Sequence, residues 1–240
     1  MAGLVTDGLV IRRADYGDYD RMITLFTPEH GRIDAIVRGC KRPKSPLMNA
    51  AEPFCAGEYQ LYHSRERYSV SQCQITDSFY DIREDYEKLT HGVYWLNLLD
   101  AAALPDMPAP TLFMIALRAL AFLNYSELPP PLLTMAFEMH YMAQQGLRPM
   151  MHQCVICGRP VDGDARFDME RGGAVCLSCH SDAPRISHGA RRIVMKLPGT
   201  KFDQVRLLDG NESWPEAARL FRRYVRLKID RHGRSEPELP

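Results

Sequence analysis

Short apolar runs separated by turn residues fill the first 80 positions of the chain, and this pattern predicts β-strands. Residues 27–31 (Thr-Pro-Glu-His-Gly) predict a hairpin turn, because proline presets a negative φ early in the turn and glycine supplies a positive φ at its end. Several short strands with no long helix between them predict a small antiparallel barrel. At this level the pattern does not distinguish an OB-fold from an SH3-like barrel. The apolar runs fall at residues 9–11, 22–26, 33–37 and 58–62.

The hydrophobic period becomes helical near residue 81, where apolar residues begin to recur three and four positions apart. Acidic residues gather at the start of the first such segment, where the helix dipole favours them. Prolines and glycines then mark the ends of the later segments, and Ser187 is a candidate N-cap. The helices expected from this pattern cover residues 81–104, 111–125, 129–146, 187–197 and 213–230.

These elements predict an α+β protein with two domains. We expect a barrel over residues 1–80 and a helical domain over 81–240, with a cysteine-rich insert at 152–182 inside the helical domain. With 240 residues, of which 45% are hydrophobic and 25% charged, the chain has enough apolar material for a substantial core. This composition excludes a disordered tail, a collagen-like fibre and a membrane channel.

The N-terminal residues lack a charged segment leading into an apolar stretch, so no signal peptide is expected. The longest apolar run, residues 112–123, is interrupted by Arg118 and is shorter than the roughly 20 residues that span a bilayer. We therefore expect a cytoplasmic protein that makes no membrane contact. Seven cysteines agree with that compartment, where thiols stay reduced and paired C-x-x-C units usually hold metal.

The strongest chemical signal is a pair of C-x-x-C units separated by eighteen residues. Each unit forms a tight knuckle that directs two thiolates at one ion, and two knuckles complete a tetrahedron. Four thiolates close the coordination sphere, whereas catalytic zinc keeps one position open for water, so one structural zinc ion is expected. Two separate redox pairs are the alternative, and His152 and His180 flank the knuckles as alternative ligands. The expected ligands are Cys154, Cys157, Cys176 and Cys179.

No motif in the sequence predicts catalysis. The phosphate-binding G-x-x-x-x-G-K-[ST], the dinucleotide fingerprint G-x-G-x-x-G and the nucleophile motif G-x-S-x-G are all absent. No H-E-x-x-H or H-x-E motif accompanies the cysteines. We therefore expect neither an enzyme nor a small-molecule substrate.

Positive charge is concentrated in two places, although the chain as a whole is neutral with 30 basic and 30 acidic residues. Four cations fall within seven residues at 38–44, directly after an expected strand, and a basic loop on a small barrel can follow a phosphate backbone. The last expected helix carries an arginine face opposite its apolar face. Both features also fit an ordinary solvated surface. The candidate contacts to a phosphate backbone are Arg38, Lys41, Arg42 and Lys44, the weaker candidate Arg32 on the preceding strand, and Arg219, Arg222, Arg223 and Arg226 on the helix, which an acidic peptide would also suit.

Residues 16–45 resemble the N-terminal signature of the RecO family of bacterial recombination mediators. The similarity is carried by the segments LFTPEHGRI and RGCKRPKS. The order of the expected parts, with a barrel followed by helices, a C-x-x-C pair and C-terminal helices, extends the resemblance to the whole chain. It implies an N-terminal OB-fold followed by a helical domain with an inserted zinc ribbon.

The resemblance also implies a function in DNA repair and recombination without nucleotide hydrolysis. Members of this family bind single- and double-stranded DNA, anneal complementary strands and associate with RecR. With RecR they help to load RecA onto DNA coated with single-strand binding protein, whose acidic C-terminal tail they recognise through the helical domain. The implied location is the cytoplasm, in association with the nucleoid.

Two other classes of protein compete with this interpretation. The first is a zinc-ribbon interaction module of the transcription or translation machinery, but residues 151–184 hold only 3 basic residues against 5 acidic ones, which disfavours nucleic-acid contact by the ribbon. The second is a zinc-dependent hydrolase, which the closed set of four cysteines and the missing general base argue against.

Overall fold

The computed structural model describes residues 3–64 and 67–230, which form two compact units that divide after Tyr125. The first unit contains five strands, three α-helices and the 3₁₀ segment Asn49–Ala51, and the second contains the other helices and a small sheet. The sequence places a domain boundary near residue 81, where the hydrophobic period changes. In the structure the first unit extends to Tyr125, because it includes the helices that pack on the barrel. The domain limits expected from the sequence stay a prediction.

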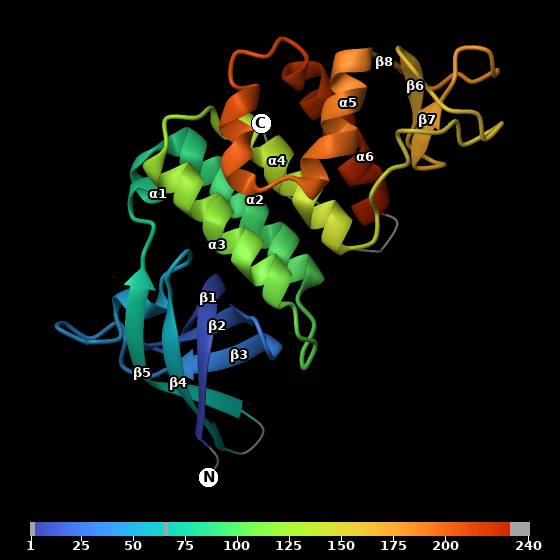
Figure 1. The fold of residues 1–240 in the computed structure, drawn as a ribbon. Coiled ribbons are helices and arrows are strands. Elements are labelled where there is room, and N and C mark those ends of the chain that lie inside the picture. The colour runs from blue at the N-terminus through green and yellow to red at the C-terminus, as the bar shows by residue number, and fades with distance from the viewer. Residues whose placement is uncertain (1–2, 65–66, 231–240) are drawn as a thin grey trace. The chain divides into compact units, whose positions relative to one another are not determined.

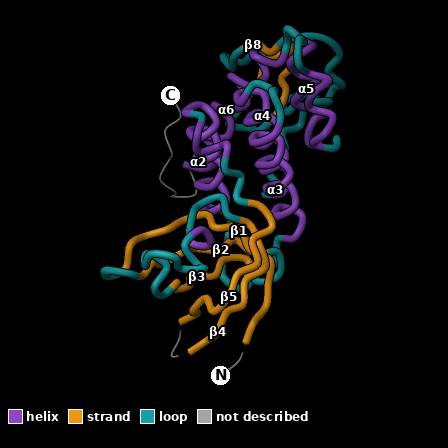
Figure 2. Tube along the Cα trace, turned by 90° about the vertical axis from the view of Figure 1, so that its left-hand side faces the viewer, coloured by secondary structure: helices purple, strands orange, loops and turns teal. Residues whose placement is uncertain are grey.

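Five strands close into the expected barrel, in the order β1-β2-β3-β5-β4 (Figure 2). Neighbouring strands are antiparallel except β3 and β5, which run parallel from the pair Ala35 and Tyr68. This OB-like closed barrel confirms the predicted fold class. The strands are β1 (Gly3–Tyr16), β2 (Asp20–Thr27), β3 (Gly31–Val37), β4 (Ala56–Ser64) and β5 (Arg67–Asp77).

The barrel core follows from the alternation of side chains along each strand. Leu25 and Leu61 are buried inward, while Glu58 and Gln60 on β4 lie on the outside. The hydroxyl of buried Tyr59 donates a hydrogen bond to the Ala50 carbonyl oxygen at 2.9 Å, so its polar end is satisfied inside the core.

The hairpin turn between β2 and β3 forms as predicted, and Gly31 ends it with a φ of +61°. The Thr27 hydroxyl donates to the Gly31 carbonyl oxygen at 3.0 Å and accepts from the His30 amide at 3.2 Å. A Cβ at residue 31 would overlap the Leu104 carbonyl oxygen and lie 2.6 Å from that of Met107. Glycine is therefore required here both for the left-handed conformation and for the close approach of the chain after α2.

Three helices complete the first unit: α1 (Asp81–Glu84), α2 (Tyr86–Ala102) and α3 (Pro110–Tyr125) (Figure 1). The prediction of a single helix over 81–104 is wrong in one respect, because the helix is interrupted at Asp85. That residue has an extended backbone, and its carboxylate accepts from the Lys88 amide at 2.9 Å, which makes it the N-cap of α2. The rings of Phe26 and Phe113 pack 5.8 Å apart and join α3 to the barrel.

The second unit is built on α4 (Pro130–Gln144), whose residues 132–142 are all buried. As expected, this helix ends before Gly146, which has a φ of +70°, and the Leu147 amide donates back to the Met142 carbonyl oxygen at 2.8 Å. The other elements are β6 (Ala165–Asp168), β7 (Gly173–Val175), β8 (Arg185–Ile186), α5 (His188–Lys196), the 3₁₀ segments Leu197–Gly199 and Phe202–Leu208, and α6 (Trp214–Asp230).

Both late helices begin where the sequence indicates. The Ser187 hydroxyl accepts from the Ala190 amide at 3.2 Å and so caps α5, and Pro215 lies in the first turn of α6. Within residues 3–64 and 67–230, every helix is too short or too polar to cross a lipid bilayer.

Candidate metal centre and basic surfaces

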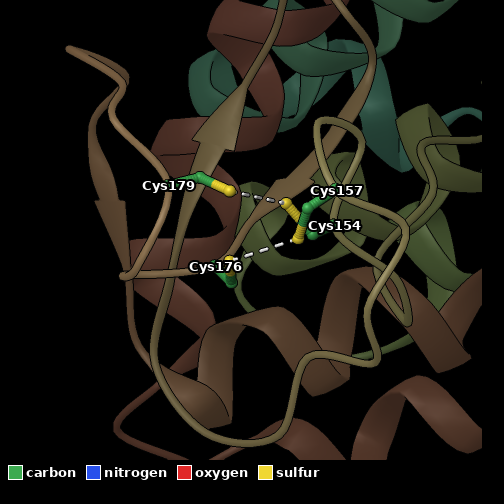
Figure 3. Close-up of side chains that lie close together, drawn as sticks. All are labelled: Cys154, Cys157, Cys176 and Cys179. Atoms are coloured by element: carbon green, nitrogen blue, oxygen red, sulfur yellow. Dashed lines mark hydrogen bonds between the residues drawn. The ribbon is translucent and has the colours of Figure 1, made fainter.

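Four thiol groups from two distant segments meet at one point in the second unit (Figure 3). Their sulfur atoms all lie within 4.8 Å of one another, with 3.9 Å between Cys154 and Cys179 and 3.7 Å between Cys157 and Cys176. We call Cys154, Cys157, Cys176 and Cys179 the thiol cluster. In the part of the chain that the structure describes, this is the one cluster of potential metal ligands, and neither His152 nor His180 belongs to it.

Backbone hydrogen bonds shape each C-x-x-C pair into a tight turn. The Gly158 amide donates to the Cys154 carbonyl oxygen at 2.9 Å, and the Cys179 amide donates to that of Cys176 at 3.1 Å. Gly158 has a φ of +72° directly after the first pair, a conformation that glycine adopts at little cost. Such turns leave the cysteine side chains of each pair on the same side of the backbone.

The small sheet β7-β6-β8 holds the two turns at a fixed separation. Phe167 on β6 and Val175 on β7 are fully buried. The ring of Phe167 packs 5.3 Å from that of Tyr224 on α6, and the Tyr224 hydroxyl donates to the Leu147 carbonyl oxygen at 2.9 Å. The insert is therefore attached to the helices of its own unit through aromatic packing.

A buried arginine makes a second attachment between the insert and α5. Arg191 is only 3% exposed, and its guanidinium donates to the carbonyl oxygens of Met151 at 2.6 Å and Gly163 at 3.0 Å. Burial lowers the pKa of this guanidinium from its usual range. Since the two carbonyl groups lie on either side of the first cysteine pair, Arg191 fixes the base of the insert to the helix.

Polar groups around the thiol cluster favour ionised sulfur at two positions. Arg159 donates to the Cys157 sulfur at 3.4 Å and lowers the pKa of that thiol. The hydroxyl of Ser178 lies 3.1 Å from the Cys176 sulfur and lowers the pKa of that thiol to about 6. By contrast, hydrogen bonding with Cys176 raises the pKa of Cys179 to about 12. Arg159 was not predicted from the sequence, although a cation two residues after a cysteine pair is a signal that could have identified it.

The geometry of the cluster matches a tetrahedral zinc site. Four sulfur atoms about 2.3 Å from a central ion lie about 3.8 Å apart along each edge of the tetrahedron. Two of the sulfur separations, 3.7 and 3.9 Å, bracket that value, and all of them are within 4.8 Å. The donor set also fits the ion, because four thiolates are typical of structural zinc and leave no open position for water.

The basic segment after β3 folds as a series of turns on the first unit. We call residues 38–44 the basic loop. The Arg42 amide donates to the Gly39 carbonyl oxygen at 3.1 Å, and the Ser45 amide donates to the Arg42 carbonyl oxygen at 3.1 Å. These two hydrogen bonds close successive turns. The Gly39 amide also donates to an Asp20 carboxylate oxygen at 2.8 Å. The loop therefore has a defined conformation, which lowers the entropy cost of binding a ligand.

The four cations of the basic loop have different surroundings. Arg38, Arg42 and Lys44 are exposed, and the Arg42 guanidinium stacks over the Tyr19 ring at 5.1 Å from its centroid. Lys41 is half-buried and its ammonium group pairs with Asp15 at 3.0 Å, which lowers the pKa of that carboxyl. Tyr19 was not predicted as part of this surface, because its proximity to Arg42 depends on the folding of β1 and β2 into a hairpin.

Arg32 lies outside this exposed group. Its guanidinium pairs with Asp100 on α2 at 2.9 Å and with Asp34 at 3.2 Å. Two carboxylates neutralise the charge and fix the side chain between β3 and α2. Arg32 is therefore paired within the first unit, and its contact with DNA stays a prediction.

The arginine face of α6 is divided by the structure. Arg219, Arg223 and Arg226 are exposed, as expected for a face opposite the buried Leu220. Arg222 differs, because its guanidinium turns toward α4 and pairs with a buried carboxylate. Three of the four arginines are thus exposed, and the fourth is paired within the fold.

Comparisons with known proteins cover nearly the entire chain. A family model described as "Recombination protein O N terminal" matches residues 1–79, and one described as "Recombination protein O C terminal" matches residues 83–237. Proteins named "DNA repair protein RecO" from Acetivibrio thermocellus and Alkaliphilus metalliredigens are each 29% identical to this chain, over 95% and 94% of it and 93% and 94% of their own lengths. The protein of the same name from Pelotomaculum thermopropionicum is 30% identical over 95% of this chain and 90% of its own length.

The second family model alone spans well over half of the 240 residues, and both models follow the order of the parts seen in the structure. The barrel, the helices and the thiol cluster agree with the resemblance that the segments LFTPEHGRI and RGCKRPKS carry. The chain belongs to the RecO family of DNA repair proteins.

Proposed function

We propose that this protein is a recombination mediator that binds single- and double-stranded DNA and anneals complementary strands. Together with RecR it helps to load RecA onto DNA coated with single-strand binding protein. The observation that carries the proposal is the basic loop on an OB-like barrel, within a chain that matches the RecO family along nearly its full length. Its place of action is the cytoplasm, in association with the nucleoid.

The proposed role requires no bond to be made or broken. Two complementary strands repel one another through their phosphates, and a cationic surface that binds both backbones reduces this repulsion. Contacts to phosphate carry no sequence information, as a mediator that acts on any gap requires. We therefore propose a protein that is not an enzyme and has no small-molecule substrate.

The primary DNA surface of this proposal is the basic loop. Arg38, Arg42 and Lys44 are its main contacts because they are exposed, and Lys41 contributes less because Asp15 shares its charge. The exposed arginines of α6, Arg219, Arg223 and Arg226, form a second candidate surface for DNA or for an acidic peptide. Arg222 has a smaller role there because it is paired within the fold.

The test of this surface is the binding of labelled single-stranded DNA, measured by fluorescence anisotropy over a salt series. Arg42→Gln combined with Lys44→Gln should weaken binding and reduce the slope of log K against log salt by about 0.7 for each lost phosphate contact. Lys201→Gln combined with Arg206→Gln removes the same charge from exposed positions outside the proposed surface and serves as the control. Equal slopes for both double variants would remove the basic loop from the DNA surface.

We propose further that the thiol cluster holds one structural zinc ion, supported by the match of its sulfur separations to tetrahedral geometry. Cys154, Cys157, Cys176 and Cys179 would be its four ligands. A four-thiolate zinc site carries a net charge of −2, and Arg159 beside Cys157 offsets part of it. The ion links the two ends of the insert and supplies folding free energy rather than chemistry.

A pocket of about 390 Å³ in the second unit is our candidate for the acidic tail of single-strand binding protein. Arg192 and Lys196 lie at this pocket, and Ile193, Leu197 and Leu207 supply apolar lining. Cations around an apolar hollow suit a short acidic peptide, whose carboxylates they can pair with. A labelled tail peptide should bind the wild type, and Lys196→Glu should weaken that binding, whereas Lys201→Glu should not.

A further inference from the structure

The outer face of the barrel has a polar pocket of about 490 Å³ beside the basic loop, within the first unit. Its lining includes side chains from two paired strands and from the segment that follows the loop: Leu47, Glu58, Gln60, Ser71, Gln72 and Gln74.

Strand register explains why these polar groups gather there. Gln60 on β4 lies opposite Gln72 on β5, and Glu58 lies opposite Gln74, so all four side chains share the outer face. The register shifts just beyond Gln60, where Ser71 is the extra residue and its hydroxyl donates to the Gln60 carbonyl oxygen at 3.0 Å. Bulges of this kind change the direction of neighbouring side chains, and they are frequent at binding sites.

The polar atoms of these side chains are available to a ligand. Across the residues that the structure describes, Gln60, Gln72, Gln74 and Glu58 make no side-chain hydrogen bond or ion pair with other protein groups. Three amide groups and one carboxylate thus line a hollow without being committed to the fold.

The pocket is lined by residues that closely follow the basic loop in the chain, Pro46 and Leu47. Strands β3 and β5 are parallel neighbours through the pairs Ala35–Tyr68 and Ile36–Ser69, and the basic loop begins directly after β3 ends at Val37. The chain then passes through Lys44, which has a φ of +64°, and returns to the barrel at Leu47, which packs against the core and forms one wall of the pocket. A short segment, from Lys44 to Leu47, therefore joins the basic loop to a hollow lined by amides.

We propose that this pocket receives an unstacked nucleobase from a DNA single strand whose phosphates contact the basic loop. The inference rests on the DNA binding proposed above and adds a site for the base. A glutamine side chain presents both a donor and an acceptor and can rotate, so three of them match the edges of different bases without selecting one. The Glu58 carboxylate repels phosphate from the hollow and accepts from the amino groups of bases. A duplex keeps its bases stacked and paired, so the pocket favours single strands.

Fluorescence anisotropy with three labelled probes tests the proposal on the full chain. The probes are a mixed-sequence single strand, a single strand of equal length with abasic sites in its central part, and a duplex. The wild type should bind the mixed-sequence strand about tenfold more tightly than the abasic strand, from one or two hydrogen bonds to a base. Gln60→Ala combined with Gln72→Ala should bring that ratio close to one and leave binding of the abasic strand and the duplex unchanged.

Thr76→Ala, at an exposed position on the same strand outside the pocket, is the matched control and should keep the wild-type ratio. An unchanged ratio in the double glutamine variant, with DNA binding intact, would overturn the base pocket alone. Wild-type affinity of the Arg42→Gln, Lys44→Gln double variant for all three probes would instead overturn the proposed DNA surface, on which the pocket depends. Failure of the wild type to bind any probe would overturn both.

Discussion

Arg222 on α6 donates from its Nε atom to a Glu138 carboxylate oxygen on α4, across 3.2 Å. The Glu138 side chain is fully buried, whereas Arg222 keeps 23% of its side chain exposed. A carboxylate in the interior is stable only with a cationic or hydrogen-bonding partner, because burial removes its hydration. The arginine face of α6 therefore contributes one of its members to the packing of α4.

This pair predicts a large effect of Arg222 on stability. Arg222→Met should lower the free energy of unfolding by about 3 kcal/mol, because it removes the cation that pairs with a buried carboxylate. The exposed Arg223 is the matched control, and Arg223→Met should change stability by less than about 0.5 kcal/mol. Urea denaturation followed by circular dichroism measures both. Adding Glu138→Met to Arg222→Met should recover most of the loss, and a further loss in the double variant would contradict this account.

Arg32 should behave as a structural residue rather than as a DNA contact. Arg32→Gln removes two ion pairs that are partly exposed, so it should destabilise the protein by about 1 kcal/mol or less. It should leave the salt dependence of DNA binding unchanged, whereas Arg42→Gln should reduce that dependence and leave stability unchanged. Thermal unfolding and anisotropy on the same two variants separate the roles. A reduced salt slope for Arg32→Gln would restore this residue to the DNA surface.

Removal of the proposed zinc ion should lower the melting temperature, because the ion joins two segments of the insert. We expect one zinc per chain in the purified protein, released by a chelator together with the fall in melting temperature. Cys176→Ser should reproduce the effect, while Cys73→Ser in the barrel should not alter the zinc content. Unchanged melting after complete metal removal would show that the ion is not a structural link.

Gly31 and Gly17 provide a matched test of close packing at a turn. Their φ values are +61° and +65°, but only at Gly31 would an added Cβ meet other atoms, the carbonyl oxygens of Leu104 and Met107. Gly17→Ala should cost about 1 kcal/mol for the left-handed conformation alone. Gly31→Ala should cost clearly more, because the chain after α2 must also move. Equal melting temperatures for the two variants would argue against this close approach.

Local chemistry made the thiol cluster predictable. Two residues between cysteines define a tight turn by themselves, and a second turn of the same kind has to meet the first for both to share an ion. The hairpin turn at 27–31 and the Ser187 cap are equally local, because each depends on the side chains of a few consecutive residues. The family signature adds the order of the parts, which the structure and the comparisons confirm.

The sequence could not determine which cations face solvent. Arg222 meets Glu138 at a separation of 84 residues, and Arg32 meets Asp100 at a separation of 68, so neither pair leaves a local signal. The break at Asp85 was missed because a helical period continues on both sides of it. The sequence by itself determined the hairpin turn, the Ser187 cap, the thiol spacing and the succession of strands, since these depend on neighbours along the chain. Only the tertiary structure decided the partners of each charge, because an ion pair depends on which elements pack together.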